Sequence, residues 1–230
     1  MTRLRIGALL VVAAAAFTAS AAGASGRGPV FISAVDSSGF PLIRATVIAP
    51  RGSRTVRLSE NGKPAVGLTA INLGKSKAIV LAVDRSESMR GRPLANAIAA
   101  AKQFVSSTGA TDHVGVVVFG RSAISLTHGE AGPGDAQSAL SDVTVDTRSG
   151  TALYDAIVSA AGELQADSRP GRAIVVITDG KDVSSLASVD AAIRAAQGAR
   201  ASVYTIGIGG PSFTPTLLRR IASETGGTYR

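Results

Sequence analysis

The sequence has no cysteine and only two histidines, His113 and His128, among its 230 residues. The lack of cysteine excludes a disulfide framework and thiol catalysis. It also makes a zinc centre improbable, because two histidines supply few of the nitrogen and sulfur ligands that zinc prefers. We expect each histidine at a strand end or in a loop. Stability must come from a packed core, for which a hydrophobic content of 45% is sufficient.

Aromatic residues are also scarce, at 4% of the sequence, and the basic residues are scattered along it. No nucleic-acid-binding surface is therefore predicted, although the net charge is +8 at pH 7. Removal of Arg3 and Arg5 with an N-terminal signal would leave +6. A basic protein of this kind favours acidic partners or anionic envelope surfaces.

Long apolar runs are missing except near the N-terminus, where residues 6–17 are apolar and follow two arginines. Small residues come next, with Ala22 and Ala24 at the positions that a signal peptidase reads. We therefore expect residues 1–24 to be a cleaved signal peptide. The alternative is an uncleaved anchor, but the run is shorter than the ~20 residues of a membrane span. The protein is expected to be exported, to the extracellular space or the cell envelope.

A short apolar run at residues 78–83 leads directly into a polar loop. The run shows no polar alternation, which is typical of a central strand in a parallel sheet. Asp84, Ser86 and Ser88 follow the strand at alternate positions, at the edge where open α/β sheets bind ligands. Three oxygen donors there suit a small hard cation such as Mg²⁺. Helix capping by Asp and Ser is the simpler alternative.

Two further stretches favour the cation. GTALYDAI, at residues 150–157, places Thr151 at the start of an amphipathic helix, and VVITDG, at residues 175–180, places Asp179 after a second apolar strand. Together with the first loop, they offer five oxygen-bearing side chains at strand ends or helix starts.

The three motifs, in this order, resemble the von Willebrand factor A domain, in which they form the metal-ion-dependent adhesion site. The resemblance covers residues 77–230. It implies that Mg²⁺ or Mn²⁺ binds there and that a Glu or Asp of a protein partner completes the coordination. The residues that would hold the cation are Asp84, Ser86 and Ser88 from the first loop, Thr151 from the second and Asp179 from the third.

The order of elements predicts an α/β fold. Residues 29–75 have β-branched content and turn-rich breaks, as expected for a small β unit with strands near 30–35, 42–49 and 54–59. From residue 77 onward, strands alternate with helices. This predicts a doubly wound, mostly parallel, Rossmann-like sheet with helices on both faces and its first strand in the centre.

The expected elements of this second region follow its apolar periodicity. The helix over 93–105 is expected to bury a stripe of Leu94, Ala97, Ile98, Ala101, Phe104 and Val105. Further helices are expected at 136–140, from Thr151 to about residue 169, at 189–197 and at 215–225, and further strands at 112–119, 123–126, 172–178 and 202–208.

A last strand is expected to begin at residues 227–230, and the domain to be cut before its final helix. The arrangement is similar to the front ends of some bacterial secretion-system or tight-adherence membrane proteins. By that resemblance, a missing C-terminal region would attach the protein to a membrane.

The function expected from these observations is metal-dependent protein binding, not catalysis. A magnesium-dependent phosphoryl-transfer enzyme is one alternative, but such enzymes need a second acid where Ser86 stands. A purely structural module of an envelope or secretion complex is another. Arg85 and Glu87 are candidates for a partner-selecting rim, whereas Lys181 and Asp182 are expected to form a solvated turn.

Overall fold

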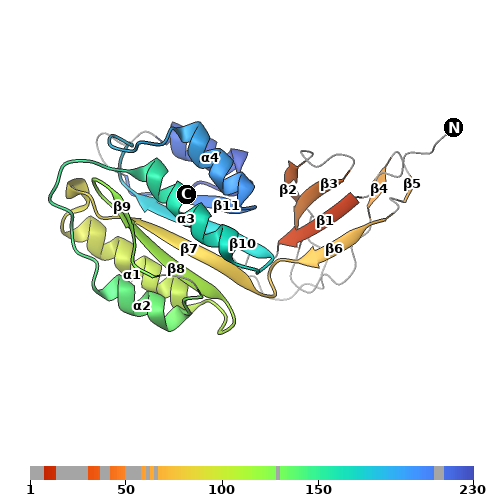
Figure 1. Ribbon diagram of the computed structural model, residues 1–230, viewed down its shortest axis with the longest axis horizontal. Coiled ribbons are helices and arrows are strands. Elements are labelled where there is room, and N and C mark those ends of the chain that lie inside the picture. The colour runs from red at the N-terminus through yellow and green to blue at the C-terminus, as the bar shows by residue number, and fades with distance from the viewer. Residues whose placement is uncertain are drawn as a thin grey trace. The chain divides into compact units, whose positions relative to one another are not determined.

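In the computed structural model of the protein, the described residues are 8–13, 31–36, 42–49, 58–60, 63–64, 67–127, 130–209 and 215–230. The chain divides into two compact units, Met1–Lys75 and Ser76–Arg230. Figure 1 shows strands in the described residues of the first unit and a sheet with helices in the second.

The first unit contains a four-stranded sheet with the order β2-β3-β1-β6. Strand β1 pairs in parallel with both of its neighbours, and β2 pairs antiparallel with β3. Two short strands, β4 and β5, form a separate antiparallel ribbon. The bounds are β1 Ala8–Ala13, β2 Phe31–Asp36, β3 Ile43–Ile48, β4 Ser59–Glu60, β5 Lys63–Pro64 and β6 Thr69–Asn72.

Strand β1 lies within the expected signal peptide, and the rest of residues 1–24 lies outside the described residues. The strand expected near 54–59 also falls mostly outside them. Strands β2 and β3 match the two other strands expected in this region.

The second unit is built on a five-stranded sheet with the order β11-β10-β7-β8-β9. All neighbours pair in parallel except β9, which runs antiparallel to β8 at one edge. The expected doubly wound sheet with the first strand at its centre is therefore confirmed. The bounds are β7 Lys77–Asp84, β8 His113–Phe119, β9 Ala123–Ser125, β10 Gly171–Thr178 and β11 Ser202–Gly207.

Helices cover both faces of this sheet (Figure 1). Helices α1 (Arg92–Ser106) and α2 (Pro133–Ser141) pack on one face, against Ile79, Leu81 and Val83 of β7. Helices α3 (Leu153–Ala166), α4 (Val189–Gly198) and α5 (Thr216–Glu224) pack on the other, against Ala78, Val80 and Ala82. Burial on both faces explains why this strand is apolar without alternation.

Three expectations about the helices are wrong in detail. Phe104 was expected in the buried stripe of α1, but its side chain is 37% exposed. At 100° per residue it lies on the flank of the stripe, whose centre is formed by Ala101 and Val105. Helix α3 begins at Leu153, two residues after Thr151, and α2 begins at Pro133, earlier than expected, because proline suits a first helical position.

The C-terminal residues continue the sheet beyond β11. Thr205 bridges to Tyr229 in parallel, and Gly207 N donates to Arg230 O at 2.8 Å. The expected beginning of a last strand is thus confirmed. Within the described ranges, no helix has the length and apolar character needed to cross a membrane.

Candidate metal centre

The carboxyl ends of β7 and β10 bring two of the three polar loops together. The two strands are neighbours in the sheet, with Val83 paired to Ile177, so that Asp84 and Thr178 end adjacent strands. From β7 the chain crosses to β8 on one side, and it returns later to β10 on the other. The loops therefore meet where the strand order reverses, which is where open α/β sheets bind ligands.

Asp84 is completely buried, and both of its carboxylate oxygens accept hydrogen bonds. Oδ1 accepts from Ser86 N at 2.8 Å, and Oδ2 accepts from Thr178 Oγ1 at 2.5 Å. Burial raises the pKa of Asp84 above its ordinary value; the bonds from Thr178 and Ser86 oppose this rise, and the nearby charge of Asp179 adds to it. A carboxylate in such surroundings gains from a neighbouring cation.

The two serines connect Asp84 to Asp179, through the backbone N of Ser86 and then through both hydroxyls. Ser86 Oγ lies 3.1 Å from Ser88 Oγ, and Ser88 Oγ donates to Asp179 Oδ1 at 2.9 Å. A single 3₁₀ turn, Glu87–Met89, sets this spacing, with Met89 N bonded to Ser86 O at 3.0 Å. The side chain of Met89 is fully buried in the core, which anchors the turn.

Thr151 lies in the segment that leads into α3 and is buried. Its carbonyl oxygen accepts from Val183 N at 3.0 Å, and the next residue, Ala152, bonds through its N–H to Gly120 O at 2.7 Å. A Cβ atom placed on Gly180 would stand 4.0 Å from Thr151 Oγ1. The hydroxyl of Thr151 is therefore close to the loop that carries Asp179.

The chemistry of these donors fits a hard divalent cation. Asp84, Ser86, Ser88 and Asp179 form one hydrogen-bonded series, and the hydroxyl of Thr151 is close to the loop that carries Asp179. Two carboxylates and three hydroxyls suit Mg²⁺ or Mn²⁺, which prefer oxygen. In the described part of the chain, no group of three or more His, Cys, Asp or Glu side chains offers a metal site of the acidic or zinc type.

The two candidate rim residues each have a hydrogen-bonding partner within the protein. Arg85 Nη1 donates to Thr144 O at 3.2 Å, so its guanidinium reaches toward the segment before Thr151. Glu87 forms a two-pronged ion pair with Arg90, at 2.8 Å for each hydrogen bond.

Asp146 holds the same segment in place and was not found from the sequence. Its backbone N donates to Arg85 O at 2.7 Å, and its carboxylate accepts from Arg121 N and from the guanidinium of Arg148. The bonds from Arg148 outweigh burial and lower the pKa of Asp146 far below its ordinary value. The Asp-x-Arg spacing was the available signal, but it is common in loops of every kind.

The expectation of a solvated turn is wrong for Asp182. Its Oδ2 accepts from Tyr154 N at 3.1 Å and from the hydroxyl of Ser185. Lys181, by contrast, is exposed. Asp182 therefore connects the loop after Asp179 to the start of α3.

The sequence profile of the von Willebrand factor type A domain matches residues 78–230, two thirds of the chain. The chain belongs to this family. The second unit is thus a type A domain, with the candidate metal centre at the carboxyl edge of its sheet. No curated protein matches the chain.

Solved structures share the fold of the type A domain. BatB from Bacteroides thetaiotaomicron is 22% identical with a TM-score of 0.57, over 66% of this chain and 88% of that one. A von Willebrand factor type A protein from Catenulispora acidiphila is 24% identical with a TM-score of 0.58, over 67% and 38%. Proximal thread matrix protein 1 from the mussel byssus, with a zinc-occupied MIDAS motif, is 18% identical with a TM-score of 0.58, over 71% and 49%.

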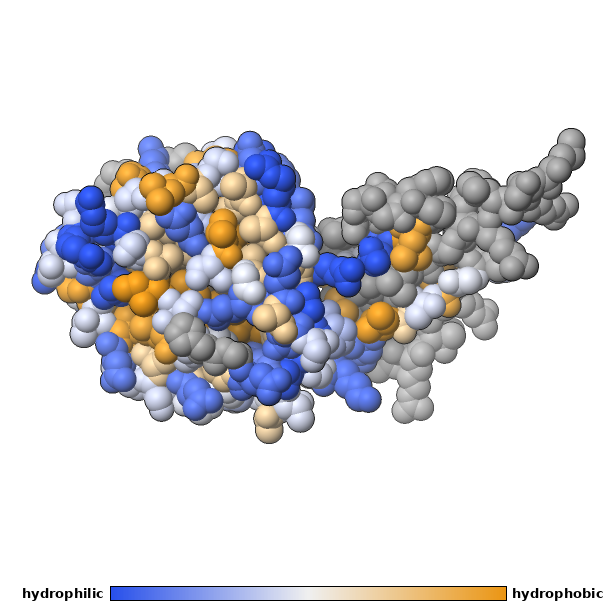
Figure 2. Space-filling view, in the orientation of Figure 1, coloured by the Kyte–Doolittle hydropathy of each residue, from blue (hydrophilic) through white to orange (hydrophobic). Residues whose placement is uncertain are grey.

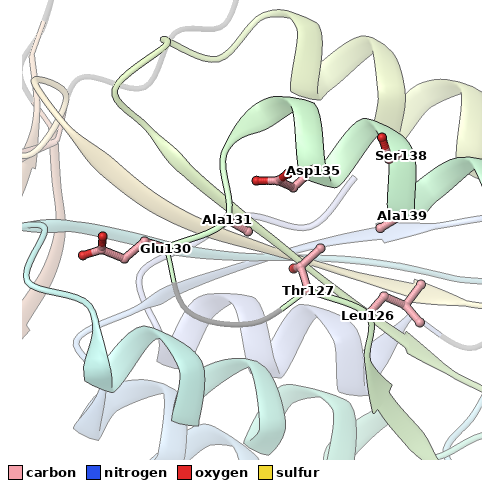
Figure 3. A pocket seen from close by; sticks show the side chains of 7 residues that line it. All are labelled: Leu126, Thr127, Glu130, Ala131, Asp135, Ser138 and Ala139. Carbon is pink, nitrogen blue, oxygen red and sulfur yellow. The ribbon is translucent and has the colours of Figure 1, made fainter.

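A hollow lies beside α2 (Figure 3). It is lined by side chains of α2, including Asp135 and Ser138, and by the segment around Ala131. Ala131 O accepts from Val114 N at the beginning of β8, which places the hollow at the amino edge. It is therefore separate from the candidate metal centre.

Proposed function

We propose that the protein is a metal-dependent protein-binding module, used for adhesion or complex assembly. Asp84, Ser86, Ser88, Thr151 and Asp179 would hold Mg²⁺ or Mn²⁺, and an Asp or Glu of a protein partner would complete the coordination. The observation that carries this proposal is the hydrogen-bonded series from Asp84 to Asp179, which joins two loops 91 residues apart. The zinc-occupied motif in the mussel protein supports a divalent cation in this family.

The small number of charges favours binding of an acidic partner. Two carboxylates would formally balance the charge of a bound divalent cation, and the hydroxyl ligands would add no further negative charge. The cation would therefore still attract a further oxygen ligand. Thr178 fixes the orientation of Asp84, and Ser88 fixes that of Asp179. The loops are thus ordered in advance, which lowers the cost of binding.

The geometry gives less support to phosphoryl transfer. Such a reaction would need Asp84 as a nucleophile, but both of its oxygens accept hydrogen bonds and its side chain is buried. Glu87, the nearest further acid in the loop, is paired with Arg90. A purely structural role remains the competing proposal, and it predicts no response to divalent cations.

We place the protein outside the cytoplasm, as an exported component of the cell envelope. The signal-like N-terminus supports this proposal. Among the structural neighbours, one from Bacteroides fragilis is described as an aerotolerance-related membrane protein. Membrane attachment through a further C-terminal region and a part in a secretion or tight-adherence assembly belong to the same proposal.

The test is calorimetric titration of Mg²⁺ and of Mn²⁺ into the full-length protein, with melting temperatures recorded at rising cation concentration. Saturable binding at one site is expected for the wild type. It should be lost in the Ser88→Ala, Asp179→Ala double variant and kept in Asp142→Ala, which removes an exposed carboxylate at the end of α2. Circular dichroism establishes that each variant is folded.

A folded wild type that neither binds the cations nor gains melting temperature would overturn the proposal in favour of the structural role. Release of phosphate from a generic phosphoester, lost in Asp84→Ala, would instead favour the enzyme.

A further inference from the structure

The loop after Asp179 bonds to Thr151 and presents two apolar side chains to solvent. We refer to residues 181–187, which lie between β10 and α4, as the 181–187 loop. Leu186 is 99% exposed and Val183 is 71% exposed, the largest exposures of any large apolar side chain in the described ranges. Their exposure forgoes the favourable free energy that burial of the two side chains would provide.

This exposure is built into the loop by hydrogen bonds. Leu186 N and Ala187 N donate to the two carboxylate oxygens of Asp155, at 3.0 and 2.9 Å. Ser185 Oγ accepts from Tyr154 N at 3.0 Å and from Asp155 N at 3.1 Å. The loop is therefore fixed to the first turn of α3, and its apolar side chains are held outward.

The loop is also fixed to one of the candidate metal-site residues. Val183 N and Ser184 N donate to Thr151 O at 3.0 and 3.3 Å, and Ser184 Oγ donates to Arg121 O at 3.0 Å. Val183 is thus one hydrogen bond away from a candidate metal-site residue. A molecule that reached the cation would lie next to the loop.

The charges around the loop suit an acidic partner. The carboxylates of Asp155 and Asp182 accept hydrogen bonds from the loop and from the start of α3, so much of their charge is already compensated. Lys181 is exposed, and no ion pair of Lys181 occurs in the described part of the molecule. Lys181 follows Asp179 by two residues, so its charge would add to the attraction of a bound cation for a partner's carboxylate.

We propose that Val183 and Leu186 form the second contact of the partner. The occupant is a protein segment that carries an aliphatic or aromatic side chain a few residues from the Glu or Asp that reaches the cation. This inference rests on the proposed metal-dependent binding and adds the chemistry of the partner.

A lipid bilayer is a less suitable occupant. The second unit has 15 Lys and Arg and 14 Asp and Glu, a net charge of +1, so it has little attraction for an anionic membrane. In the face of the molecule shown in Figure 2, the apolar groups of this unit are small and interrupted by hydrophilic ones. Two apolar side chains suit a short peptide contact better than insertion into lipid.

The experiment selects random displayed peptides on the immobilised full-length protein in Mg²⁺ and elutes them with a chelator. Wild type should enrich peptides that combine Asp or Glu with a nearby apolar residue. The Val183→Ser, Leu186→Ser double variant should still enrich the acidic residue but lose the apolar preference. Phe104→Ser is the matched control, because this exposed residue lies in the last turn of α1, about 18 Å along the helix from its start.

Affinity measurements on one selected peptide complete the test. Leu186→Ser should weaken binding about tenfold or more, and Leu186→Ile and Phe104→Ser should leave it nearly unchanged. Mg²⁺ affinity without peptide should be the same in all of these variants. Since Leu186 is almost fully exposed, its substitution should not lower the melting temperature.

Each other outcome has a distinct meaning. Acidic enrichment without an apolar preference in wild type would overturn this inference and leave the proposed function intact. No peptide eluted by the chelator would overturn both. Flotation with phosphatidylserine vesicles that depends on Leu186 would assign the loop to a membrane and overturn the peptide contact.

Discussion

Thr178 Oγ1 donates a 2.5 Å hydrogen bond to Asp84 Oδ2 across the carboxyl ends of two neighbouring strands. The two residues are 94 positions apart in the sequence, and both side chains are completely buried. The bond fixes which way the carboxylate of Asp84 faces. Thr178 therefore supports the candidate metal centre without being one of its proposed ligands.

Replacing Thr178 with valine keeps the shape of the side chain but removes this donor. We expect Mg²⁺ affinity to fall about 10- to 100-fold, as for other residues that orient a metal ligand. The loss of a partner for a buried carboxylate should also cost about 1–3 kcal/mol of unfolding free energy. Calorimetry and chemical denaturation measure the two effects. Thr178→Ser keeps the hydroxyl, so equal weakening in this control would count against the assigned role.

A second prediction concerns the pH dependence of stability through Asp112. Burial alone would raise the pKa of this carboxyl, but bonds from Gly109 N and from the backbone and ammonium of Lys77 outweigh it and lower the pKa. A lowered folded-state pKa contributes stability that is present above the unfolded pKa, about 4, and is lost as pH falls through the folded value.

We therefore expect Asp112→Asn to lower the unfolding free energy by about 1–3 kcal/mol at neutral pH. The difference from wild type should shrink as the pH falls below about 4. Denaturant titrations across that range measure it. A difference that stayed constant with pH would show that the charge of Asp112 does not contribute.

Two glycines should respond to alanine in opposite directions. A Cβ on Gly227 would lie 2.0 Å from Val203 O, so Gly227→Ala must displace backbone and should destabilise the domain. A Cβ on Gly162, inside α3, would meet no atom within 4 Å, and Gly162→Ala should stabilise it by about 0.5–1 kcal/mol. Thermal denaturation of both variants is the measurement, and a stable Gly227→Ala would show that this close approach is not needed.

The proposed export of the protein provides a further prediction. Cleavage after Ala24 should yield a chain that begins at Ser25. It would remove β1, which lies between β3 and β6 in the first unit. Mass spectrometry of protein recovered outside the cytoplasm shows whether residues 1–24 have been removed. A mass that retained residues 1–24 would favour an uncleaved N-terminus and a mature protein that keeps this strand.

Local patterns in the sequence were enough to predict most elements of the second unit. Unbroken apolar runs marked β7 and β10, and the spacing of Leu94, Ala97 and Ala101 marked one face of α1. Boundaries were less well predicted, because the position of Thr151 relative to α3 depends on its bonds to distant loops. In the N-terminal unit, the parallel pairing of β1 with β3 and β6 had no local signal.

The sequence by itself determined most of the strand and helix order of the second unit and its family, and it indicated the five oxygen-bearing residues of the proposed site, because these follow from local periodicity and short motifs. Only the tertiary structure decided that Thr178 orients Asp84, that Asp146 anchors the segment before Thr151, and that Asp155 holds Leu186 in solvent. Each is a contact between segments far apart in the chain. Such contacts depend on how packed elements orient their side chains, which no local pattern encodes.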